Sequence, residues 1–138
     1  MRSKLFIASA LLAMGCSSPT DTGPVLVEAL IYGFDEEDPR VSLELTGSSL
    51  SVGVTSYGNG CRTIGELRVS VENDTRHLTV APFDWENRGV ICPDLLRTFQ
   101  HQETVELAGE GEWTVLVVGR TGGGQVPVQF AYTVNVES

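Results

Sequence analysis

Apolar and polar residues alternate along most of this chain with a period close to two, which is the period of half-buried β-strands. The longest such run covers residues 126–136, where six apolar residues share one parity and mainly polar residues share the other. Segments 25–34 and 113–119 are apolar on both parities, as strands buried on both faces are. We therefore predict an all-β fold of about eight strands, with no amphipathic helix from residue 25 onward. Shorter alternating runs occur at residues 41–45, 50–54, 67–71, 78–80 and 105–107.

Residues typical of tight turns separate these runs, and the chain is long enough for one modest hydrophobic core. Short strands at this spacing are typical of two antiparallel sheets that pack face to face. The sequence therefore predicts a single antiparallel two-sheet sandwich over residues 25–138. The turn signals lie at residues 37–39, 46–48, 57–60, 72–74 and 120–124.

One segment resembles a known fold family. Residues 107–115, Leu-Ala-Gly-Glu-Gly-Glu-Trp-Thr-Val, are similar to the corner that precedes the penultimate strand of immunoglobulin-like domains, with Trp113 where a tyrosine usually stands. An indole donates through a single N–H that lies in a different place from a phenol O–H, so the hydrogen bond of that corner is not expected to carry over unchanged. The resemblance covers the second half of the chain and implies an immunoglobulin-like sandwich.

The N-terminal segment has the layout of a secretory signal. Arg2 and Lys4 precede an apolar run over residues 5–14. As a helix this run would span roughly 15 Å, about half of a bilayer core, which is too short for a permanent transmembrane anchor. We therefore interpret residues 1–15 as a signal peptide that forms a helix and directs export.

The signal ends in Leu12-Ala13-Met14-Gly15-Cys16, which resembles the lipobox of bacterial lipoproteins. The resemblance implies that Cys16 receives a diacylglycerol, that cleavage occurs just before it, and that the mature chain is anchored to a membrane of the cell envelope. Residues 17–24 are rich in Ser, Thr, Gly and Pro, as flexible tethers are. Ser17 stands where an aspartate would favour the inner membrane, so the outer membrane is favoured if the organism is Gram-negative. The alternative is an ordinary signal peptide in which Cys16 is incidental.

If Cys16 carries lipid, Cys61 and Cys92 remain as an even pair in an oxidising compartment, and we predict a disulfide between them. Metal binding is the rival interpretation. It is disfavoured because the chain has no CxxC pair and because His77 and His101 are not arranged near the cysteines in a zinc-like pattern.

Charge excludes some partners. The chain has 9 Lys and Arg residues against 18 Asp and Glu, a formal net charge of -9, and two of the cations precede Cys16. Such an acidic surface repels phosphate backbones and anionic lipid headgroups, so nucleic-acid binding and electrostatic docking on membranes are disfavoured.

The longest segment without clear periodicity is residues 82–98, and long irregular loops are often functional. Its mixture of aromatic and polar side chains suits contact with a ligand or partner, although the two aromatic residues could instead cap one end of the sandwich. The candidate binding residues are Phe83, Asp84, Trp85, Asn87 and Arg88.

Other candidate chemistry has a plain interpretation. The glycines at 122–124 lack the ending of a phosphate loop and predict a hairpin turn. The acidic run at 35–38 could collect calcium, but it lacks the oxygen spacing of an EF-hand loop and is expected to be a solvated turn. His77 and His101 are expected on the surface. Glu110 and Glu112 are expected as ordinary acidic residues of an acidic chain.

No catalytic constellation, cofactor motif or metal motif stands out. The sequence therefore predicts a lipid-anchored cell-envelope protein whose non-catalytic β-sandwich serves structure or binds an envelope protein partner. The alternative is a small ligand-binding module, for example for carbohydrate, that uses the 82–98 loop.

Overall fold

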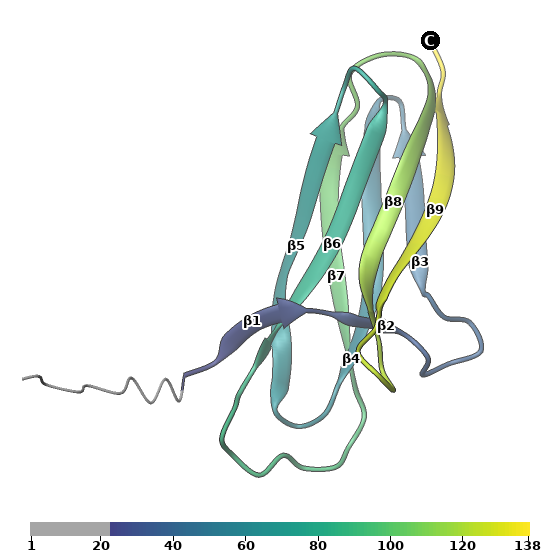
Figure 1. The fold of residues 1–138 in the computed structure, drawn as a ribbon. Helices are drawn as coiled ribbons and strands as arrows, with labels where there is room; N and C mark the ends of the chain where they lie inside the picture. Colours follow the sequence, from purple (N-terminus) through teal and green to yellow (C-terminus); the bar gives the residue numbers. More distant parts are fainter. Residues whose placement is uncertain (1–22) are drawn as a thin grey trace, which may run out of the picture.

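A computed structural model describes residues 23–138, and these residues form nine β-strands and no helix (Figure 1). The all-β prediction is confirmed. The additional strand arises because segment 25–34 divides at Ala29, whose N–H donates to the Pro82 carbonyl and whose carbonyl accepts from the Arg120 N–H. The strands are β1 (Val25–Glu28), β2 (Leu30–Tyr32), β3 (Val41–Thr46), β4 (Ser49–Gly58), β5 (Arg62–Glu72), β6 (His77–Glu86), β7 (Arg97–Glu106), β8 (Gly111–Thr121) and β9 (Pro127–Val136).

Hydrogen bonds join the nine strands into one mixed sheet along the path β1-β6-β8-β2-β4-β3, with β5 on β6, β7 on β4 and β9 on β8. Figure 1 shows β5, β6, β8 and β9 side by side, with β7, β4 and β3 behind them. The sheet is not antiparallel throughout, because β8 runs parallel to both β6 and β2. The physical reason is that β7, which lies between β6 and β8 in sequence, pairs with β4, so β8 returns to β6 in the same direction.

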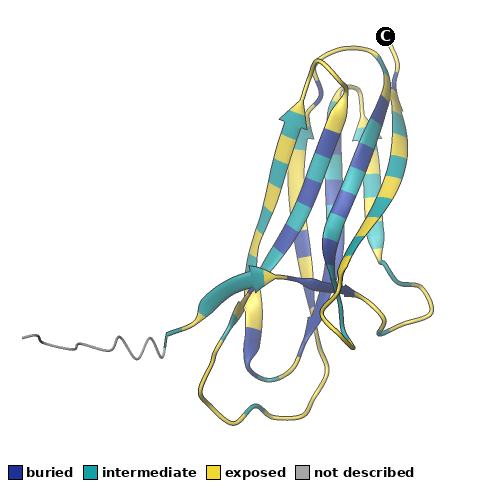
Figure 2. Cartoon of the chain, in the orientation of Figure 1, coloured by how far each residue is buried: buried dark blue, intermediate teal, exposed yellow. Residues whose placement is uncertain are grey.

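Both groups of strands contribute residues to one hydrophobic core. Inward residues alternate with outward ones along β6 and β8, as Figure 2 shows by the alternation of buried and less buried bands. Burial of these side chains removes apolar surface from water, which is the main force that holds the two groups together. The fully buried apolar residues include Ile31, Leu50, Val52, Leu78, Val80, Trp113, Val115 and Val117.

Trp113 makes a hydrogen bond at the corner that resembles immunoglobulin-like domains. Its side chain is fully buried, and its indole Nε1–H donates to the Gly109 carbonyl, four residues upstream, at 3.2 Å. Gly109 has a φ of 104° and Gly111 a φ of 107°, backbone conformations that side chains rarely permit. The bond therefore joins Trp113, near the start of β8, to the turn that precedes this strand.

The predicted disulfide is present. Cys61 lies just before β5, Cys92 lies between β6 and β7, and their Cα atoms are 5.1 Å apart. The bond therefore fastens the irregular segment between β6 and β7 to the beginning of β5.

The predicted signal peptide, the lipobox and Cys16 lie outside the described residues, as does most of the predicted tether. The part of the chain that the structure describes contains no helix long and apolar enough to cross a bilayer.

Replacing both cysteines, Cys61→Ser with Cys92→Ser, should lower the free energy of unfolding by about 3 to 4 kcal/mol, because the bond closes a loop of 31 residues in the unfolded chain. Urea unfolding of oxidised, reduced and double-serine protein measures the difference. Equal stability of the oxidised and reduced forms would contradict a structural role for the bond.

Candidate functional site

The predicted loop at 82–98 is shorter than expected. Strand β6 continues through Glu86, so Phe83, Asp84 and Trp85 lie in a strand, and the irregular segment covers only residues 87–96. We call residues 87–96 the stapled loop. The alternation was hidden because the two inward positions at this end of β6 carry Pro82 and Asp84 rather than aliphatic residues.

The five candidate binding residues do not come together. Phe83 packs beneath the guanidinium of Arg68, whose carbon lies 4.3 Å from the ring centroid, and Trp85 is 41% exposed. Asp84 is fully buried on the opposite face of the strand. Asn87 and Arg88 begin the stapled loop. Because successive strand residues point to opposite faces, one ligand cannot contact the side chains of both Asp84 and Trp85.

Asp84 belongs to a buried polar cluster that joins three strands. Its Oδ2 accepts a hydrogen bond from the Ser56 hydroxyl on β4 at 2.6 Å, and its Oδ1 lies 2.9 Å from the His101 Nε2 on β7. The Ser56 Oγ and His101 Nε2 are themselves 3.0 Å apart. All three side chains are buried, so the expectation that His101 lies on the surface is wrong. His101 faces inward because it shares the parity of Phe99 on β7.

This cluster contains the residue types of a serine hydrolase in a different arrangement. In a catalytic triad the histidine uses one ring nitrogen for the carboxylate and the other for the serine, and the serine gives its proton to the imidazole. Here both partners contact Nε2, and the Ser56 hydroxyl donates to the carboxylate of Asp84 instead. The arrangement satisfies three buried polar groups and fixes β4, β6 and β7 relative to one another.

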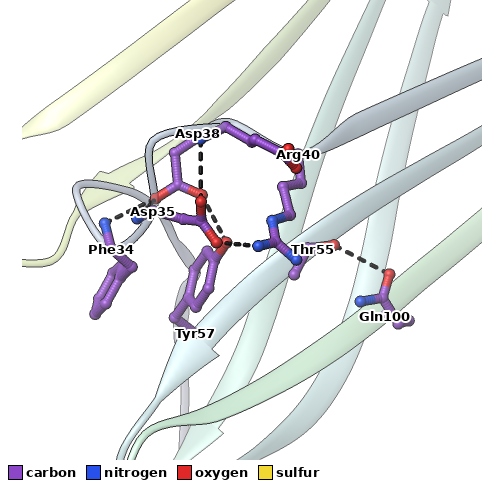
Figure 3. A network of polar contacts seen from close by, with 8 residues as sticks. Phe34, Asp35, Asp38, Arg40, Thr55, Tyr57 and Gln100 are labelled. Carbon is purple, nitrogen blue, oxygen red and sulfur yellow. Dashed lines mark hydrogen bonds and ion pairs between the residues drawn. The ribbon is translucent and has the colours of Figure 1, made fainter.

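The acidic run at 35–38 is a turn in which Asp35, Glu36 and Glu37 are exposed, as expected, whereas Asp38 is half-buried and bonded within the fold (Figure 3). The Asp38 carboxylate accepts hydrogen bonds from the backbone N–H groups of Phe34 and Asp35, both at 2.7 Å, and from the Tyr57 hydroxyl at 2.6 Å. The Phe34 ring stacks on the Tyr57 ring with centroids 4.5 Å apart. Asp35 pairs with Arg40. The carboxylates of Asp35 and Asp38 therefore accept hydrogen bonds from donors of the protein. Among residues 23–138, no group of three metal-ligating side chains comes together.

The pKa values of Tyr57 on β4 and of Asp35 in the acidic loop depart from their ordinary values. Burial, followed by the hydrogen bond to Asp38, raises the pKa of Tyr57 to about 12. The backbone N–H of Glu37, with help from Arg40, lowers the pKa of Asp35.

A shallow cleft of about 370 Å³ adjoins the acidic loop, between β3 and β7. Arg40 on its rim is paired with Asp35, and the Thr55 hydroxyl donates to the Gln100 side chain at 3.0 Å (Figure 3). Arg40, Thr55 and Gln100 thus bond other groups of the protein.

The stapled loop has the opposite character, because it presents apolar side chains to solvent. Ile91 is 99% exposed, Leu96 62%, Val90 60% and Leu95 48%. Sequence reasoning missed these residues, although the signal was available: four apolar side chains stand in a segment without strand periodicity.

Backbone contacts at its base hold the stapled loop in place. The Asn87 N–H donates to the Cys61 carbonyl at 2.9 Å, and the Gly60 N–H donates to the Pro93 carbonyl at 3.1 Å. Together with the disulfide they fasten the loop on both sides of Val90 and Ile91.

A second cleft, of about 320 Å³, lies beside the stapled loop, and Leu95 and Leu96 form part of its wall. Arg62 lines it as a buried cation whose Nη2 pairs with Glu86 at 2.8 Å, while its Nη1 is buried without a hydrogen-bond partner. None of the five candidate binding residues lines this cleft. The exposed apolar residues of the stapled loop are therefore the main candidate contact surface.

Asp84→Leu should destabilise the fold by about 3 kcal/mol, because it leaves the Ser56 hydroxyl and the His101 imidazole buried without their shared acceptor. Urea unfolding measures the loss. As a control, Ser56→Ala and His101→Leu added to Asp84→Leu should recover part of the stability, because no polar group then remains unsatisfied. Wild-type stability for Asp84→Leu alone would show that the cluster does not hold the strands.

Alkaline unfolding should report Tyr57. Its folded pKa of about 12 lies above the ordinary value of 10.0, so its contribution to the free energy of unfolding is complete below pH 10 and is lost as the pH rises from about 10 to about 12. The loss should amount to about 2 to 3 kcal/mol. Denaturant unfolding between pH 9 and pH 12 measures it, and Tyr57→Phe should remove this part of the pH dependence. An absorbance titration in which all three tyrosines ionise near pH 10 would contradict it.

Comparison with known proteins assigns no family. No family model matches the chain, and neither a curated protein nor a solved structure does so.

Proposed function

We propose that this protein is a lipid-anchored component of the bacterial cell envelope whose immunoglobulin-like β-sandwich makes contacts rather than catalysing a reaction. The observation that carries the proposal is the stapled loop, which holds four apolar side chains in solvent. Soluble domains seldom keep such side chains exposed next to one another unless the surface meets a partner or a membrane.

The case for contact over catalysis rests on accessibility. The one cluster with the residue types of a nucleophilic enzyme, Ser56, Asp84 and His101, is buried and satisfies its own hydrogen bonds. A catalytic group must reach its substrate and needs a partner that takes its proton. The exposed surface, in contrast, consists of side chains that gain free energy from burial against another apolar surface.

The case for an immunoglobulin-like sandwich rests on the core and on the corner. One apolar cluster contains residues of β4 as well as of β6 and β8, as expected where two layers face each other. Trp113 supports the resemblance, because it donates to the backbone four residues upstream, near the position where the family has a tyrosine corner.

The case for the anchor rests on the lipobox-like segment and on the disulfide. The bond between Cys61 and Cys92 is consistent with an oxidising compartment such as the periplasm or cell surface, and it leaves Cys16 as the one other cysteine of the chain. Ser17 after that cysteine favours the outer membrane in a Gram-negative organism.

The anchor is tested by metabolic labelling with radioactive palmitate. The full-length chain should incorporate label and sediment with membranes, and Cys16→Ala should lose both properties, because the thiol is the attachment site. Cys92→Ser is the matched control, since it also removes a cysteine but should keep the label. Incorporation that survives Cys16→Ala would overturn the anchoring part of the proposal.

A further inference from the structure

The exposed apolar residues of the domain gather at one end. Besides those of the stapled loop, the exposed large hydrophobic residues are Tyr32, Ile64, Trp85 and Val126. Trp85 lies two residues before the stapled loop and Ile64 three residues after Cys61, while Tyr32 pairs with Thr121 next to the turn that contains Val126. Leu95, Leu96 and Gln125 line one cleft, which brings that turn and the stapled loop together.

The opposite end of the domain is acidic and presents none of these exposed apolar residues. The turns after β3, β5 and β7 meet there, because Leu107 N–H donates to the Ser48 carbonyl and Thr114 N–H donates to the Arg76 carbonyl (Figure 1). The acidic residues in these turns and at the adjoining strand ends are Glu72, Asp74, Glu106, Glu110 and Glu112.

The stapled loop differs in charge from the chain as a whole. Residues 87–97 contain Arg88 and Arg97 against a single acidic residue, Asp94, so this segment is slightly cationic within a chain of net charge -9. The stapled loop itself therefore repels anionic headgroups less than the acidic loop at 35–38, which lies at the same end of the domain because Asp38 bonds Tyr57 near the end of β4.

The N-terminal segment leaves the domain at this same end. Val25 at the beginning of β1 pairs with Glu86 at the end of β6, and the two strands are antiparallel. The chain before Val25 therefore departs beside the first residues of the stapled loop. Nine residue steps separate Cys16 from Val25, which span at most about 30 Å when fully extended.

We propose that the stapled loop inserts its apolar residues into the interface of the lipid bilayer that holds the chain's own anchor. This inference rests on the proposed function, because the lipid on Cys16 brings the loop to the membrane. Ile91, as the most exposed residue, enters deepest, while Arg88 and Arg97 remain at the headgroups. The domain then stands on the membrane with its acidic end pointing away.

The test places a tryptophan at the tip of the loop in the full-length protein. Ile91→Trp leaves the fold intact, because the side chain it replaces is 99% exposed. The protein is reconstituted into vesicles of phosphatidylethanolamine and phosphatidylglycerol, with and without bromine on the acyl chains. Bromine quenches tryptophan that lies within the bilayer, and the wild-type protein supplies the background from Trp85 and Trp113.

Asp74→Trp is the matched control, because Asp74 is also exposed but lies at the acidic end. The tryptophan at position 91 should be quenched at least about twofold more strongly than the one at position 74, since interfacial segments bury about 5 to 10 Å into the headgroup and acyl boundary. Equal quenching of the two variants would overturn the inference.

The outcomes separate the insertion from the anchor. Palmitate labelling of the same preparations reports whether the lipid is attached. If the protein is labelled but the tryptophan at position 91 is not quenched, the proposed insertion of the loop is wrong and the proposed lipid anchor is supported. Quenching at position 91 in unlabelled protein overturns the anchor and supports insertion. The tryptophan at position 91 could also stay unquenched in vesicles but be shielded from iodide in intact cell envelopes. This result would indicate that the loop contacts a protein partner, and it would overturn insertion.

Discussion

The burial of one carboxylate constrains much of this domain. Asp84 lies at an inward position of β6, and a carboxylate there is costly unless donors surround it. Ser56 and His101 provide those donors from β4 and β7, so the two groups of strands are held together by directional bonds as well as by apolar packing. The same contacts fix the end of β6, and β6 in turn positions both β1 and the start of the stapled loop.

The polar networks and the exposed apolar residues occupy different parts of the domain. Asp38 accepts from Tyr57 and from nearby backbone, and Arg40 pairs with Asp35, so these polar contacts fasten the acidic loop to β4. The apolar side chains of the stapled loop are exposed rather than packed inside the domain, although the disulfide at Cys92 and the backbone hydrogen bonds of the loop keep it in place. A surface that is both held in place and apolar is suited to contact, because little conformational freedom is lost on binding.

Local patterns predicted some elements well and others poorly, for physical reasons. Residues 126–136 alternate because β9 packs only one face, so its parity is visible in the sequence. The end of β6 was missed because Asp84 occupies an inward position where the pattern requires an apolar residue. His101 was placed on the surface for a similar reason, since a polar side chain is read as exposed unless its partners are known. The Trp113 hydrogen bond to Gly109 was not foreseen, because it depends on the glycine backbone of the corner.

The sequence by itself determined the all-β class and most of the strands, because alternation is a property of the chain that needs no distant contact. It also predicted the pairing of Cys61 with Cys92, on the condition that Cys16 carries lipid. Only the tertiary structure decided which strands are neighbours, including the parallel pairing of β8 with β6, because pairing depends on where the chain crosses between layers. It also decided which polar residues are buried and which apolar residues remain outside. These outcomes join residues far apart in sequence, such as Ser56 and His101, and no local pattern records such a contact.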